Sequence, residues 1–176
     1  SNRISEVLTG RKRVFTLTPF SIRELSHKST PFELHDKLEE RLVFGSYPEM
    51  IGLDSFQNMK EYLNDITSSY LYKDILELET IRYPHKIRNL LSLLSYQVGS
   101  QVNISELSKN LKLNSETVER YLFLLEQSFI VFKLPAFSTN PRKEVSKSDK
   151  YFFFDNGIRN MLIDDLRTIS ERNDIG

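Results

Sequence analysis

Residues 103–125 have the sequence NISELSKNLKLNSETVERYLFLL, and this stretch decides the fold. Asn103 is followed three residues later by a glutamate, which is the pattern of a helix-capping box. A short helix is therefore expected from there to Leu111, then a tight turn at 112–114 and a longer helix beginning near Ser115. A short helix, a turn of three or four residues and a longer helix form the layout of a helix-turn-helix motif.

Apolar residues in and before this stretch recur every three or four positions, as they do on the buried face of a helix. In the longer helix they are Val118, Tyr121, Leu122, Leu125 and Phe129, and in a preceding helix they are Ile87, Leu90, Leu91, Leu94 and Val98. Gly99 is expected to cap the end of that preceding helix. We expect Tyr121 and Leu125 to face Leu91 and Leu94 across the core.

Two strand-like runs follow the helix-turn-helix, at 129–134 and 150–154, with a polar loop between them that contains Asn140 and Pro141. Three helices followed by two strands predict a winged helix over residues 84–155. A final helix is expected over 158–166.

The residues before the winged helix have a different pattern. Helical periodicity covers 26–83, with Thr30 as a cap before Pro31 and one long helix starting at Asp54. Near the N-terminus, residues 13–17 alternate between polar and apolar side chains, which is typical of a strand. Such a strand needs a partner, so we expect either a sheet upstream of Ser1 or pairing with a C-terminal strand of this chain. The predicted fold class is mainly α, with a small β wing.

Composition excludes several classes of protein. The 176 residues include 24 Lys or Arg, 24 Asp or Glu and no Cys, so a disulfide scaffold, a thiolate metal site and a cysteine nucleophile are all excluded. His27, His35 and His85 lack the spacing of helical zinc ligands. No run approaches the roughly 20 apolar residues that cross a bilayer, and no signal-peptide core is present. We therefore expect a soluble cytoplasmic protein without a membrane partner.

Seven stretches lie in a fixed order along nearly the whole chain. They are LTGR at 8–11, LTPFS at 17–21, FGSYPE at 44–49, YLYKDI at 70–75, TVERYL at 117–122 with LE at 125–126, NPRK at 140–143, and KSDKYFFFDNG at 147–157. Together they resemble the C-terminal region, of unassigned function, of prokaryotic AAA-superfamily P-loop ATPases that carry a winged helix.

The resemblance implies four parts. Residues 1–25 would be the remnant of the end of an ATPase core, 26–83 a helical lid, 84–155 the winged helix, and 156–176 a C-terminal helix leading to a missing downstream module. It also implies that the parent protein binds ATP and Mg²⁺, and that the upstream ATPase core is a partner of this chain.

The chain itself departs from that family at the points where catalysis would occur. It contains no Gly-x-x-x-x-Gly-Lys-Ser/Thr motif to cradle nucleotide phosphates, so no cofactor is expected to bind this chain alone. In an intact ATPase, Arg11 and Lys73 are candidates to reach the γ-phosphate. The alternatives are a surface basic cluster for Arg11 and an ion pair with Glu77 for Lys73.

Positive charge is concentrated in the predicted winged helix. Residues 84–154 contain ten Lys or Arg against six Asp or Glu, while the rest of the chain has a net charge of −4. Candidate contacts to duplex DNA are Arg120 on the longer helix and Arg142, Lys143, Lys147 and Lys150 near the wing. Three glutamates on the longer helix, Glu116, Glu119 and Glu126, oppose entry into a DNA groove. The favoured expectation is therefore a non-catalytic module for protein docking or domain positioning, with weak DNA binding or a free-standing transcription regulator as alternatives.

Overall fold

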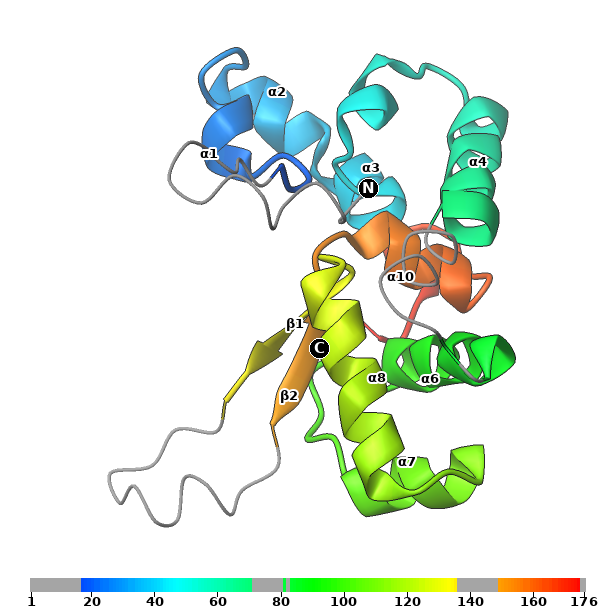
Figure 1. Cartoon of the computed structure of the whole chain (residues 1–176). Coiled ribbons are helices and arrows are strands. Elements are labelled where there is room, and N and C mark those ends of the chain that lie inside the picture. Colours follow the sequence, from blue (N-terminus) through cyan, green and yellow to red (C-terminus); the bar gives the residue numbers. More distant parts are fainter. Residues whose placement is uncertain (1–16, 71–80, 82, 136–148, 175–176) are drawn as a thin grey trace, which may run out of the picture.

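The structure is a computed structural model that describes residues 17–70, 81, 83–135 and 149–174, apart from the side chains of residues 69 and 70. The described chain is mainly helical and contains one two-stranded antiparallel sheet, which confirms the predicted fold class (Figure 1). Its elements are α1 (Ile22–Leu25), α2 (Pro31–Asp36), α3 (Leu38–Phe44), the 3-10 helix η2 (Pro48–Gly52), α4 (Phe56–Asp65), the π-helical turn η3 (Ile66–Tyr70), α6 (Pro84–Tyr96), α7 (Ile104–Leu111), α8 (Ser115–Gln127), β1 (Val131–Leu134), β2 (Lys150–Phe153), α10 (Asn156–Leu162) and the 3-10 helix η4 (Ile169–Glu171).

Helices α7 and α8 form the predicted helix-turn-helix, and side-chain caps set where each begins. The Asn103 side chain accepts hydrogen bonds from the N–H groups of Ser105 and Glu106, and Asn114 caps α8 through the N–H of Thr117 at 2.8 Å. Lys112 ends α7 in the left-handed conformation, with φ of 52°. The turn at 112–114 lies where the sequence predicts it.

Strands β1 and β2 pair so that Val131 lies opposite Phe153 and Phe132 lies opposite Phe152. Because successive side chains of a strand point to opposite faces, the first pair and the second pair lie on different faces of the sheet. Val131 and Phe153 are buried in the core, so Phe132 and Phe152 point away from it.

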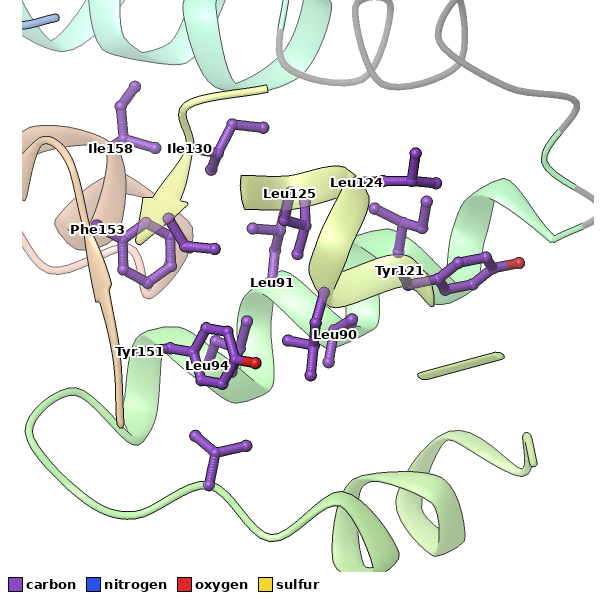
Figure 2. Close-up of a cluster of buried hydrophobic side chains, with 14 of the residues drawn as sticks. Leu90, Leu91, Leu94, Tyr121, Leu124, Leu125, Ile130, Tyr151, Phe153 and Ile158 are labelled. Carbon is purple, nitrogen blue, oxygen red and sulfur yellow. The ribbon is translucent and has the colours of Figure 1, made fainter. Parts of the chain in front are cut away.

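The part of the core drawn in Figure 2 lies between α6, α8 and the inner face of the sheet, and the same core continues to α3, α4, α7 and α10. Leu91, Leu94, Tyr121 and Leu125 are all buried in it, as their spacing predicts. The burial of these residues is therefore confirmed, whereas the expected pairing of Tyr121 and Leu125 with Leu91 and Leu94 stays a prediction.

Two residues expected in the core are instead exposed. Val98 lies beyond α6, which already ends at Tyr96, because the chain leaves the helix to form a bridge between Gln101 and Lys150. Gly99 consequently lies in the following turn and does not cap the helix. Phe129 lies beyond the end of α8, where its φ of 53° reverses the chain toward β1.

The N-terminal helices agree in part with the sequence patterns. Thr30 caps α2 as predicted, and the Glu33 side chain completes a capping box that was not predicted. The long helix expected from Asp54 is interrupted after α4 by the π-helical turn η3, and residues 71–80 lie outside the described part of the chain. The strand predicted at 13–17 also lies outside it, apart from Leu17, which belongs to no strand.

Helix α10 packs against α3, α4 and α6, and so joins the N-terminal helices to the part of the chain that begins with α6 (Figure 1). Its Asn160 amide donates to the carbonyl oxygens of Leu42 at 3.0 Å and Val43 at 2.8 Å, which lie in the last turn of α3. The helix ends at Leu162, four residues before the predicted end, and Asp164 follows in the left-handed conformation. No helix within the described residues is long and apolar enough to cross a membrane.

Candidate functional site

The outer surface of α8 would enter a DNA groove in a groove-binding winged helix. Its exposed side chains include Glu116, Glu119, Arg120 and Phe123. The guanidinium carbon of Arg120 lies 5.8 Å from the ring centroid of its neighbour Tyr121. The two carboxylates would repel DNA phosphates, and the phenyl ring offers the phosphates neither a charge nor a hydrogen-bond donor, so this surface disfavours close approach to DNA.

The other predicted site residues are only partly within the described chain. Lys150 lies in β2 opposite Leu134 and is half-buried. Arg142, Lys143 and Lys147 lie outside the described residues, as do Arg11 and Lys73. Near the wing, Lys133 forms an ion pair with Asp149 at 3.6 Å, so part of the basic charge there is balanced within the chain.

Four phenylalanine rings form a continuous cluster on the side of the sheet that faces away from the core. Phe132 stacks on Phe152 with centroids 5.6 Å apart, and meets Phe154 edge-on at 5.2 Å. Phe129 meets Phe154 edge-on at 5.9 Å. We call Phe129, Phe132, Phe152 and Phe154 the aromatic face. Two of these rings keep a large exposed fraction, 45% for Phe129 and 40% for Phe132.

The aromatic face is not part of the core. Tyr151 and Phe153 of β2 are the buried side chains on the inner side of the sheet. Leu134 extends the apolar surface along β1 and is half exposed. A contiguous exposed apolar surface of this kind is typical of a binding surface.

A cavity of about 210 Å³ adjoins the aromatic face, and Phe152 lines it. Val98, Leu42 and Ile169 supply further apolar walls. The polar part of the lining comes from α10 and from the chain that follows it, and includes Arg159 and Arg172. One ring therefore belongs to both the aromatic face and the cavity.

Two buried arginines share one carboxylate at this cavity. Arg172 donates to Asp174 from Nε at 2.9 Å and from Nη2 at 2.7 Å, and Arg159 forms an ion pair with the same Asp174. The Nε of Arg159 also donates to the carbonyl oxygen of Ser95 at 2.8 Å. Hydrogen bonds from Arg172, and then from Arg159, hold the pKa of Asp174 well below its ordinary value of 3.8.

Sequence reasoning identified neither the aromatic face nor these arginines as site residues. The run of aromatic residues at 151–154 was a usable signal, because alternation in a strand places such a run on both faces of the sheet. No local signal marks Arg159, whose partner Ser95 lies 64 residues earlier in the chain. Within the described residues, no group of His, Asp and Glu side chains could hold a metal ion.

Comparison with known proteins gives a family but no activity. A family model described as "Domain of unknown function (DUF8612)" matches residues 35–168. The chain is 28% identical over 173 residues to a protein described as "Uncharacterized protein" from Haemophilus influenzae, covering 93% of this chain and 43% of the relative. It is 26% identical over 167 residues to "Uncharacterized protein MJ1544" from Methanocaldococcus jannaschii, covering 86% of this chain and 38% of that relative.

A third relative, "Uncharacterized protein Rv2008c" from Mycobacterium tuberculosis, is 26% identical over 171 residues, which cover 96% of this chain and 37% of the relative. The chain thus spans about two fifths of the length of these curated relatives. No solved structure matches it significantly. None of these descriptions names an ATPase or a winged helix, so the resemblance to AAA-superfamily ATPases stays a prediction.

Proposed function

The chain belongs to the DUF8612 family of domains of unknown function, and on that premise we propose that it is a non-catalytic docking module of a longer protein. The aromatic face is the docking surface. Its partner is a segment of the same longer protein that lies outside residues 1–176. The length of the relatives supports this choice, because more than half of each lies outside the region that matches this chain.

The observation that carries the proposal is the exposure of Phe129 and Phe132 on a two-stranded sheet. Covering apolar surface is favourable by roughly 25 cal/mol per Å². Aromatic residues are also enriched in protein interfaces, where large rigid rings give contact area at little entropic cost. A second protein layer over the aromatic face would therefore stabilise both parts.

Duplex DNA is the weaker candidate for this surface. DNA is bound through cations that contact phosphates, whereas the aromatic face consists of uncharged rings. The neighbouring helix α8 presents Glu116 and Glu119, which repel phosphates. An ATPase core with bound ATP and Mg²⁺ is the docking partner that the resemblance implies, and in that setting the module would position the core without taking part in hydrolysis.

Site-specific photocrosslinking tests the proposal. A photoreactive phenylalanine analogue is placed at position 132 of the full-length gene product, and the crosslinked peptides are identified by mass spectrometry. We expect crosslinks to one defined segment of the same polypeptide outside residues 1–176. The control position is Phe32 on α2, which is 78% exposed and does not belong to the aromatic face.

Three results would contradict the proposal. Crosslinking at position 132 no stronger than at position 32 would mean that nothing covers the aromatic face. Crosslinks to nucleic acid would favour the DNA alternative. Crosslinks between identical peptides of two molecules would show self-association through this face.

A further inference from the structure

The cavity beside the aromatic face has an uneven charge balance. Of the charged residues that line it, Arg159 and Arg172 are cationic and Asp174 alone is anionic. Both arginines are buried, with exposed fractions of 9% and 8%. Glu39 lies near the rim, but it is exposed and its carboxylate accepts the N–H of Ile169 at 2.9 Å. The lining therefore has one more positive charge than negative charge.

The hydrogen bonds of the two guanidinium groups differ. Arg172 uses all three of its nitrogens, on Asp174, on the amide oxygen of Asn160 and on the carbonyl oxygen of Asp165. Arg159 uses Nε on Ser95 and Nη1 on Asp174 and Asn160. Within the described part of the chain, the Nη2 of Arg159 has no hydrogen-bond partner. Arg159 lines the cavity, and a carboxylate oxygen is the acceptor that a guanidinium nitrogen binds most strongly.

We propose that this cavity binds the carboxylate side chain of an Asp or Glu residue in the segment that docks on the aromatic face. The carboxylate accepts from Nη2 of Arg159 and balances the excess positive charge. The neighbouring apolar side chains of that segment pack on Val98 and Phe152, since Phe152 belongs to both the cavity and the aromatic face. This inference rests on the proposed docking function and adds the chemistry of the partner, an apolar segment with one acidic residue.

The cavity can be tested separately from docking, with a small carboxylate as the probe. The chain is titrated with 3-phenylpropionate, and the NMR signals of Val98, Phe152 and Asn156 are followed. The uncharged 3-phenylpropionamide serves as the control ligand. We expect the carboxylate to bind about tenfold more tightly than the amide, because only the carboxylate makes a charge-assisted hydrogen bond to Arg159.

A pair of variants at Val98 provides a test that leaves the buried arginines in place. Val98 lines the cavity and is 39% exposed, so a longer polar side chain is tolerated there. Val98→Glu supplies a tethered carboxylate and should abolish binding of 3-phenylpropionate. Val98→Gln has nearly the same shape without the charge, and should retain most of the binding.

The outcomes separate this inference from the docking proposal. Equal binding of acid and amide, no binding of either, or equal loss in the two Val98 variants would overturn the carboxylate site, even where the crosslink at position 132 is found. Selective binding of the acid supports the carboxylate site, and a missing crosslink at position 132 would then contradict the docking proposal alone.

Discussion

The carboxylate of Asp155 accepts a hydrogen bond from the backbone N–H of Ser46 at 2.7 Å, across 109 residues of chain. Its other oxygen accepts from the N–H of Ile158 at 3.2 Å and so caps α10. The backbone at residues 44–45 lies so close to residues 155–157 that each of the two segments requires a glycine. A Cβ at Gly45 would lie 1.9 Å from Asp155, and one at Gly157 would lie 2.1 Å from the carbonyl oxygen of Phe44. This contact joins the segment that follows α3 to the start of α10.

Replacing Gly45 by alanine should therefore destabilise the whole chain. Gly45 has a φ of 84° and a ψ of −165°, a conformation that costs a residue with a side chain about 1–3 kcal/mol. The clash with Asp155 adds roughly 1–3 kcal/mol of overpacking. Urea unfolding should show a total loss of about 2–6 kcal/mol.

Two other glycines serve as controls for Gly45→Ala. Gly99 has a φ of 79° but open space around its Cβ position, so Gly99→Ala should lose only the backbone cost of about 1–2 kcal/mol. Gly52 has open space and no positive φ, so Gly52→Ala should change stability by less than about 0.5 kcal/mol. Equal losses at all three positions would contradict the close packing of Gly45 on Asp155.

Asp174 should give the chain a stability that is lost in acid. Its pKa is held below 3.8 in the folded chain by Arg172 and Arg159, so the unfolded state binds a proton more readily than the folded state. The contribution is fully present above the unfolded pKa and is lost as pH falls through the lower folded pKa. Wild type should therefore be more stable than Asp174→Asn at pH 7, and urea unfolding between about pH 5 and 2 should show this difference shrinking. A difference independent of pH would contradict the ionic role of Asp174.

Asp155 should show the opposite dependence. Burial raises its pKa above 3.8, more strongly than hydrogen bonds from the backbone lower it. The Asp155 carboxyl then binds its proton more tightly in the folded state than in the unfolded state. The stability that this protonation gives is fully present below the unfolded pKa and is lost as pH rises through the folded pKa. The stability of wild type relative to Asp155→Asn, measured by urea unfolding, should decrease from pH 4 upward. An increase over that interval would mean that the backbone donors outweigh burial.

Core packing predicts a large effect of Leu125→Ala. Leu125 is fully buried between α6 and the sheet, so removing its methyl groups should cost roughly 2–5 kcal/mol through lost transfer energy and a cavity. Phe123→Ala on the same helix is the control, because Phe123 is 58% exposed and should cost much less. A loss below about 0.5 kcal/mol for Leu125→Ala in denaturant unfolding would show that this face of α8 is not the packed one.

The parts of the fold that were predicted from sequence depend on local signals. Asn103, Asn114 and Thr30 mark helix starts because each cap bonds an N–H two or three residues away. The predicted end of α6 was wrong. Val98 continues the apolar spacing after Leu94, but the backbone leaves the helix before Val98 and forms a bridge from Gln101 to Lys150. The two residues of that bridge are 49 positions apart, so the local spacing of apolar residues does not indicate it.

Less of the candidate site than of the fold could be predicted from the sequence. The run of aromatic residues at 151–154 indicates a strand, but its outer face is exposed only because no further layer covers it in the described fold. Arg159 and Arg172 do not differ in sequence from surface arginines, and their burial results from the packing of α10 and the chain after it. Asp155 belongs to a stretch that supports the family resemblance. Its hydrogen bond to Ser46 joins residues 109 positions apart, so no local pattern indicates it.

If the DNA alternative holds, duplex DNA should bind this chain weakly and without sequence preference. The binding is then expected to come from the four cations near the wing, Arg142, Lys143, Lys147 and Lys150, and four phosphate contacts give a log–log salt slope of about −3.6. Binding measured by fluorescence anisotropy with two unrelated duplexes should be nearly equal for both and largely lost at ~0.2 M salt. Lys143→Glu combined with Lys147→Glu should abolish it, whereas Arg120→Ala should change it little.

The acidic side chains of α8 provide the decisive control. If Glu116 and Glu119 hold α8 away from the groove, then Glu116→Gln with Glu119→Gln should strengthen binding to both duplexes alike, because two repulsive charges are removed without adding a base contact. Strong discrimination between the duplexes by wild type would instead place α8 in the groove and contradict the protein-docking proposal. No binding even at ~50 mM salt, where counterion release favours phosphate contacts most, would eliminate the DNA alternative and leave the aromatic face as the functional surface.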